Sequence, residues 1–130
     1  MTQEEKDLLL KDLCARLPYS VKISVRSWDE REMEYVDRVD VLYSVNGDEY
    51  IQTVNSDYNF SPEDIKPYLF PMSSMTEEQK KEWQSLMIRD SYGILYHTIE
   101  SFDYLYKNHI DFRGLIEKGL AEDATGKNIY

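Results

Sequence analysis

The stretch that decides the fold is SVKISVRSWDEREMEYVDRVDVLYSVNGDEYIQTV, residues 20–54. Apolar and polar residues alternate from Val21 to Val25, and a second alternating run extends from Met33 to Val45. A hydrophobic period of two is typical of a half-buried strand. Residues 20–54 therefore predict an antiparallel sheet of about three strands.

The second run ends at Asn46-Gly47, and a further run of apolar residues starts at Tyr50. Asn-Gly favours a two-residue type I′ turn, because both central residues must adopt positive φ. This turn predicts three facing pairs across a hairpin: Tyr43 with Tyr50, Val39 with Val54, and Leu42 with Ile51. A three-residue loop would shift this register.

A helical pattern precedes the sheet. Thr2-Gln3-Glu4-Glu5 has the form of a capping box, and leucines at helical spacing follow it. We expect a helix from about residue 3 to Leu17, where Pro18 ends it. Cys14 lies on the apolar stripe of this helix, so we expect it in the core.

Three or four helices are expected after the sheet. We expect a short helix to begin at Ser61-Pro62. Pro67 and Pro71 bracket the apolar residues that come next, so we expect residues 67–71 to follow as an extended apolar connector. A second capping box at residues 76–79 begins a helix that extends to about Ile88.

The C-terminal part is less regular. Residues 94–96 fit either a short strand or the start of a helix, and residues 99–109 carry an apolar helical stripe. Asp111 is expected to cap a last short helix closed by Gly119. Residues 121–130 are expected to form a mobile tail.

The hydrophobic period changes from helical to two and back again, which predicts an α+β fold in a single domain, residues 1–130. The expected core residues share the apolar faces of these elements: Leu13, Leu17, Val21, Ile23, Val41, Trp83, Phe102, Leu105 and Leu115.

Composition limits the class of protein. The 130 residues are 42% hydrophobic and 31% charged, with one cysteine and a formal net charge of −10. One cysteine cannot form an internal disulfide, and no secretory signal is recognised at the start of the chain. The longest apolar run has three residues, whereas a membrane helix needs about 20. We therefore expect a cytoplasmic protein without membrane association.

Almost the whole negative excess lies on residues 28–64, which contain 11 of the 25 acidic residues but only two of the 15 basic ones. Such a surface attracts a basic protein and repels nucleic acid, so we expect a basic partner and no direct nucleic-acid binding. The same acids would also solubilise the sheet and protect its edge strand.

Tyrosines are the second feature of the acidic segment. Four of the 11 tyrosines lie in it: Tyr35, Tyr43, Tyr50 and Tyr58. Tyrosine is enriched at protein interfaces, although ordinary core positions would also explain these residues. The candidate partner-binding residues are Trp28, Asp29, Glu30, Glu32, Glu34, Tyr35 and Tyr50.

Catalytic motifs are absent from the sequence. It contains no glycine-rich phosphate loop, nucleophile elbow or paired cysteine motif. The candidate metal ligands lack zinc-protease or di-iron spacing: His97, Glu100, Asp103, His109 and Asp111. We assign no catalytic residue, metal site or cofactor. The leading hypothesis is a non-enzymatic accessory or protein-interaction domain; the alternative is a small hydrolase or other enzyme that uses His97, His109 and nearby carboxylates.

Several segments resemble a known family. They include EEKDLLLKDL at residues 4–13, RLPY at 16–19, IKPYLFPMSSMTEE at 65–78 and NHIDFRGLIEKGLA at 108–121. These segments resemble a family of small uncharacterised proteins from gut Bacteroidetes genomes and their prophages. The resemblance implies an intracellular bacterial protein linked to mobile elements, and it implies no activity or cofactor. Residues 20–60 lie outside the resembling segments.

Overall fold

The computed structural model describes residues 1–47 and 50–130. Helix α1 (Gln3–Arg16) begins at the predicted capping box, in which the Thr2 hydroxyl accepts a hydrogen bond from the Glu5 amide and the Glu5 carboxylate accepts one from the Thr2 amide. A 3₁₀ turn, η1 (Leu17–Tyr19), follows directly. Proline is tolerated in the first turn of a helix, so Pro18 ends α1 without ending the helical path of the chain.

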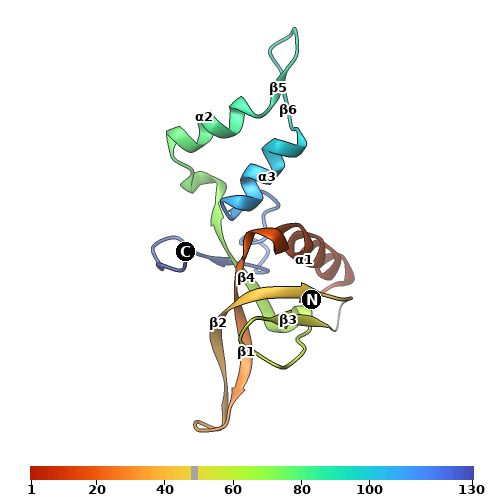
Figure 1. The fold of residues 1–130 in the computed structure, drawn as a ribbon, viewed down its shortest axis with the longest axis vertical. Coiled ribbons are helices and arrows are strands. Elements are labelled where there is room, and N and C mark those ends of the chain that lie inside the picture. Colours follow the sequence, from red (N-terminus) through yellow and green to blue (C-terminus); the bar gives the residue numbers. More distant parts are fainter. Residues whose placement is uncertain (48–49) are drawn as a thin grey trace.

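The central element is a mixed sheet in the order β3-β2-β1-β4-β7, with β8 also paired to β4 (Figure 1). Its strands are β1 (Lys22–Asp29), β2 (Glu34–Val45), β3 (Ile51–Thr53), β4 (Ile65–Pro71), β7 (Ile110–Asp111) and β8 (Glu122–Asp123). The predicted α+β class is confirmed. The expectation of about three strands, all antiparallel, is wrong, because β4 pairs in parallel with both β7 and β8.

Strand β4 is the segment that the sequence predicts as an apolar connector. It follows a 3₁₀ turn, η2 (Pro62–Asp64), where a short helix was expected. Its residues still alternate: Ile65 and Leu69 are buried, and Lys66 is exposed. Strand β4 pairs with β1 up to Pro67 and with β8 from Tyr68 onward. Pro67 therefore lies between two ladders, and the amide hydrogen that it lacks interrupts neither of them.

The β2–β3 hairpin has a different register from the predicted one. Val45 lies opposite Ile51, and Leu42 lies opposite Thr53 beyond an irregularity. The predicted pairs Tyr43–Tyr50, Val39–Val54 and Leu42–Ile51 are therefore wrong. Five residues connect Val45 to Ile51, so a two-residue turn does not set the register. The turn includes residues 48–49, which lie outside the described residues.

The main core lies between α1 and the sheet, and a smaller cluster lies against α3 (Ile99–Lys107). Five of the predicted core residues are buried: Leu13, Val21, Ile23, Leu105 and Leu115. Four are only half-buried: Leu17, Val41, Trp83 and Phe102. Cys14, also expected in the core, is exposed. The face of α1 that packs inward carries Leu9, Asp12, Leu13 and Arg16 instead.

The C-terminal half contains fewer helices than expected. A 3₁₀ turn, η3 (Met72–Ser74), leads into α2 (Glu77–Ser85), which begins at the predicted capping box. Helix α2 ends before Ile88, because β5 (Ile88–Arg89) pairs there with β6 (Leu95–Tyr96). Residues 95–96 are therefore strand, one of the two alternatives that the sequence allows. Asp111 accepts hydrogen bonds from the amides of Leu115 and Ile116, but the segment that it caps forms turns rather than a helix.

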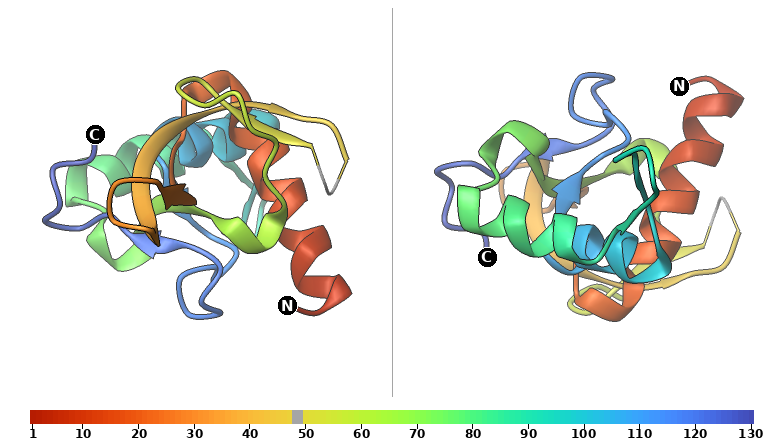
Figure 2. Two further views of the ribbon diagram at one scale, coloured as in Figure 1. Left: turned by 90° about the horizontal axis from the view of Figure 1, so that it is seen from below. Right: turned by 90° about the horizontal axis from the view of Figure 1, so that it is seen from above.

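Residues 121–130 are docked on the sheet, where the sequence predicts a mobile tail. The Ala124 amide donates to the Leu69 carbonyl at 2.8 Å, next to the β4–β8 pairing. The Tyr130 hydroxyl accepts from the Lys22 amide at 2.9 Å and donates to the Tyr68 carbonyl at 2.8 Å. Figure 2 shows this segment and the start of α1 on opposite sides of the molecule.

Two hairpins mark the ends of the long axis. The β1–β2 hairpin extends to one end, and the β5–β6 hairpin extends to the other (Figure 1). The sheet and α1 lie between them.

Candidate functional site

The β1–β2 hairpin carries most of the predicted site. Strand β1 pairs with β4 only from Ile23 to Val25, and β3 pairs with β2 only from Leu42 to Val45. In the described part of the chain, residues 26–29 and 34–37 therefore pair only with each other. This end of the hairpin extends beyond the sheet and presents its side chains to solvent.

Trp28 and Tyr35 form an aromatic pair on this hairpin. They lie directly opposite each other, with ring centroids 5.1 Å apart and an angle of 72° between the rings. The Arg26 guanidinium lies 5.2 Å from the centroid of the Tyr35 ring. Edge-to-face and cation–π contacts of this kind restrict the side chains, which still remain 46% and 60% exposed. The result is a preorganised, exposed aromatic surface.

Asp29 shapes the loop at the tip. Its Oδ1 atom accepts hydrogen bonds from the amides of Arg31 (2.9 Å) and Glu32 (3.3 Å), and its Oδ2 atom lies 3.4 Å from Arg38 Nη2. These contacts give Asp29, one of the predicted site residues, a role in holding the shape of this loop. Glu30, Glu32 and Glu34 are exposed around it.

Two grooves lie beside the hairpin. The first, called the aromatic groove here, has a volume of about 600 Å³ and is lined by Arg26, Trp28, Glu30, Tyr35, Tyr58, Phe60, Glu63 and Asp64, with Ser27. The second, of about 460 Å³, shares Ser27, Trp28, Tyr58 and Phe60 with it. The Ser27 hydroxyl oxygen is buried and has no hydrogen-bond partner within residues 1–47 and 50–130.

Asp40 holds the segment that completes both grooves. This buried carboxylate accepts, at Oδ1, hydrogen bonds from the Val41 amide (2.7 Å), the Asn55 amide (3.1 Å) and Asn55 Nδ2 (3.0 Å). Phe60 then exchanges two backbone hydrogen bonds with Ile51. These contacts fix residues 55–60 beside the hairpin and place Tyr58 there, exposed.

The aromatic groove is acidic. Three carboxylates line it, from Glu30, Glu63 and Asp64, against the single guanidinium of Arg26. Lys6 Nζ lies 3.1 Å from the Glu63 carboxylate. A hydrogen bond from its own amide, followed by the contact with Lys6, lowers the pKa of Glu63, so this carboxylate is ionised at neutral pH.

The structure separates Tyr50 from the other candidates. Tyr50 is exposed just before β3, and its carbonyl accepts a hydrogen bond from the Asn46 amide. The path along β2 from Tyr35 to Asn46 is about 35 Å at about 3.3 Å per residue. Tyr50 therefore lies at the opposite end of β2 from Trp28 and Tyr35.

Of the residues that line the aromatic groove, the sequence predicted Trp28, Glu30 and Tyr35 as site residues. It did not predict five others: Arg26, Ser27, Phe60, Glu63 and Asp64. It noted Tyr58 among the tyrosines of the acidic segment but did not place it in the site. Residues 55–60 carry no regular hydrophobic period. Their position depends on Asp40, whose role only the folded chain reveals.

The two histidines of the enzyme alternative lie at opposite ends of α3. His97 precedes the helix and stacks on Phe102 at 4.5 Å, whereas His109 follows it and stacks on Tyr130 at 3.8 Å. Nine residues of helix span about 14 Å. The structure therefore does not bring His97 and His109 into one site. Among the described residues, no three His, Cys, Asp or Glu side chains are grouped to hold a metal ion.

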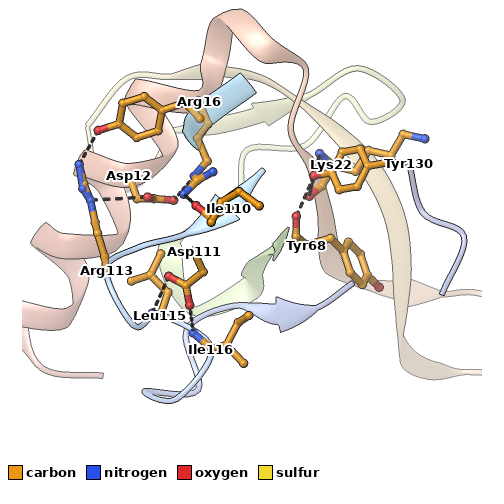
Figure 3. Close-up of polar contacts among 11 residues, drawn as sticks. Asp12, Arg16, Lys22, Tyr68, Ile110, Asp111, Arg113, Leu115, Ile116 and Tyr130 are labelled. Atoms are coloured by element: carbon orange, nitrogen blue, oxygen red, sulfur yellow. Dashed lines mark hydrogen bonds and ion pairs between the residues drawn. The ribbon is translucent and has the colours of Figure 1, made fainter. Parts of the chain in front are cut away.

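A buried ionic cluster links α1 to β7 (Figure 3). Arg16 Nε lies 2.7 Å from Asp12 Oδ2, and Arg16 Nη2 donates to the Ile110 carbonyl at 2.7 Å. Arg113 Nε lies 3.6 Å from Asp12 Oδ1. Because Asp12 and Arg16 are both fully buried, we interpret this cluster as a structural link rather than a binding site.

The described helices include none that is long and apolar enough to cross a membrane. No protein-family model, curated protein or solved structure matches the chain.

Proposed function

We propose that the protein is a non-enzymatic protein-interaction domain that binds a basic protein at the β1–β2 hairpin and the aromatic groove. The observation that carries the proposal is the convergence of Trp28, Tyr35 and Tyr58 on one groove that three carboxylates also line. Exposed aromatic side chains supply short-range contact, and the carboxylates attract a partner of opposite charge.

The resemblance to the Bacteroidetes prophage family supports a bacterial setting linked to mobile elements. A single cysteine supports a reducing compartment, and we propose the cytoplasm. Residues 20–60 lie outside the segments that resemble the family. The hairpin is therefore the part that would give this chain its own partner.

The first test measures electrostatic attraction. Protein is captured from the native host with the wild-type chain, and association of the purified partner is then compared with the variant Glu30→Lys, Glu32→Lys, Glu34→Lys. We expect the association rate to fall about tenfold at low salt and much less at high salt, because the attraction is screened beyond about 8 Å in physiological buffer. Exposed single charges contribute little to stability, so the variant should remain folded.

The matched control reverses three exposed acids away from the hairpin: Glu78, Asp103 and Glu117. This control changes the net charge by the same amount. Its association rate should stay near the wild-type value at high salt, and it should exceed that of the hairpin variant at low salt. Equal rates for the two variants would contradict a hairpin site, because the effect would then reflect net charge alone.

The second test measures short-range contact. Tyr35→Ala and Tyr58→Ala should each speed dissociation about tenfold or more, because hot-spot aromatic residues act mainly on the dissociation rate. Tyr43→Ala is the control, since Tyr43 is also exposed but lies farther along β2. An unchanged dissociation rate in both groove variants would contradict the proposal.

A further inference from the structure

The β5–β6 hairpin presents a second surface, at the opposite end of the molecule from the β1–β2 hairpin (Figure 1). Six large hydrophobic side chains are exposed on and beside it: Leu86, Ile88, Tyr92, Ile94, Tyr96 and Ile99. We call this set the apical patch. Tyr92 is 88% exposed and Ile99 is 77% exposed. Isolated exposed hydrophobic residues are common, but clusters of this kind usually mark an interaction surface.

The hairpin orients these side chains together. Ile88 lies directly opposite Tyr96. Ile94 lies just before β6, and its carbonyl accepts a hydrogen bond from the Asp90 amide, so the pairing of the two strands continues to Ile94. Side chains two residues apart point to the same face of a strand. Ile88, Ile94 and Tyr96 therefore share one face of the hairpin.

Polar contacts within the hairpin fix its shape. Asp90 Oδ1 accepts hydrogen bonds from the amides of Tyr92 and Ile94, both at 2.9 Å, and Asp90 Oδ2 accepts one from the Tyr96 hydroxyl at 3.1 Å. Arg89 Nη1 donates to the Gly93 carbonyl at 2.8 Å. The turn satisfies its own polar groups, so the apolar side chains are left as its contact surface.

Exposure of these apolar side chains to water is unfavourable for the folded hairpin. A two-stranded hairpin is marginally stable in water when it packs on nothing else. Burial of apolar surface stabilises by about 25 cal/mol per Å². A partner that covers the apical patch would therefore stabilise the hairpin as well as bind it.

The charge distribution indicates what covers the patch. Residues 76–107, which surround it, contain six acidic and four basic residues, whereas residues 28–64 contain 11 and two. A strongly charged partner finds little complementary charge at the apical end. A second copy of the chain finds an equally apolar surface there, and its acidic hairpin then points away from that of the first copy.

We propose that two copies of the chain associate through the apical patch in a closed two-fold contact. In such an isologous interface the same patch of each copy faces the other, so the assembly ends at the dimer. Each copy keeps its β1–β2 hairpin free at the far end. The proposal does not depend on the identity or existence of a basic partner.

The test is the molar mass in solution, measured by light scattering and sedimentation equilibrium from about 1 μM to 1 mM protein. The wild-type chain should move from the protomer mass of 15.5 kDa to twice that mass as its concentration rises. The variant Ile88→Glu, Ile94→Glu should remain at the protomer mass throughout. Both side chains are exposed, at 63% and 53%, so the variant should keep the circular dichroism of the folded protein.

The matched control is Val39→Glu, Val54→Glu, which adds the same charge at one side chain on β2, 51% exposed, and one just after β3, 59% exposed. It should dimerise like the wild-type chain. A second patch variant, Tyr92→Ser, tests the turn without added charge and should weaken the dimer about tenfold or more. A wild-type chain that stays monomeric to 1 mM, or that forms an open-ended series, overturns the proposal. So does a dimer that the patch variants leave intact, or one that the control disrupts as strongly.

Discussion

His109 shows how one side chain can link the stability of the protein to pH. Its ring stacks on Tyr130 with centroids 3.8 Å apart and an angle of 12° between the rings. Burial first, and then the charges of Arg16 and Lys22, lower the pKa of His109 to about 4. The neutral ring is therefore the form that the native packing accommodates.

The free energy of unfolding should rise with pH between about 4 and 6.5, the pKa values of His109 in the folded and unfolded states. Between these values the unfolded chain binds a proton that the native protein excludes. The stabilisation is present above pH 6.5 and is lost as pH falls toward 4. His109→Asn removes the titrating group and suits the backbone, where residue 109 has a φ of 59°. Urea unfolding at several pH values should show a smaller slope for this variant; an unchanged slope would exclude His109 as its source.

Residue burial in α1 could be predicted only in part. The residues that pack inward, Leu9, Asp12, Leu13 and Arg16, have helical spacing, but two of them are charged. An apolar pattern alone therefore favours the neighbouring face, which contains Cys14. Asp12 and Arg16 are four residues apart, the spacing of a helical ion pair, which the sequence shows. Arg16 also donates to the Ile110 carbonyl, 94 residues along the chain, and the sequence does not show this partner.

At the scale of elements, Asp40 joins β2 to the segment that forms the grooves. Asp40→Ala removes the acceptor of three hydrogen bonds and should lower the free energy of unfolding by about 1–3 kcal/mol. It should also increase the amide exchange rate of Asn55, whose amide donates to Asp40 at 3.1 Å. Hydrogen exchange by NMR measures this directly.

Asp40→Asn is the matched control, because it keeps an oxygen acceptor at the same position and removes only the charge. It should retain most of the Asn55 protection and most of the stability. If Asp40→Ala left the Asn55 amide as protected as in the wild-type protein, the segment 55–60 would have to be held by other contacts.

The elements that local patterns define could be predicted, and those that depend on distant partners could not. The capping boxes at Thr2 and Thr76 begin α1 and α2 as expected. Strand β4 contains two prolines, so its sequence resembles a connector until β1, β7 and β8 pair with it. Strand β8 has only two residues and becomes a strand only because β4 lies beside it.

At the scale of the whole molecule, the sequence predicts the charge asymmetry but not its geometry. The acidic excess of residues 28–64 is visible in the sequence. The aromatic groove, however, needs Tyr58 and Phe60 to lie beside Trp28 and Tyr35. The fold also places the near-neutral β5–β6 hairpin at the far end of the long axis (Figure 1). Two surfaces of different chemistry are thereby separated, which allows their binding to be distinguished by salt.

Salt should affect the two ends differently. Attraction at the acidic hairpin acts over distance, so its association rate with a basic partner should fall about tenfold or more between about 50 and 500 mM salt. Contact through the apical patch relies on apolar burial, so the dissociation constant of the dimer should change by less than about threefold over the same range. Stopped-flow mixing measures the first and sedimentation equilibrium the second. If salt instead strengthened the dimer tenfold or more, the acidic hairpins of the two copies would have to lie close enough to repel each other, and a contact through the apical ends would be wrong.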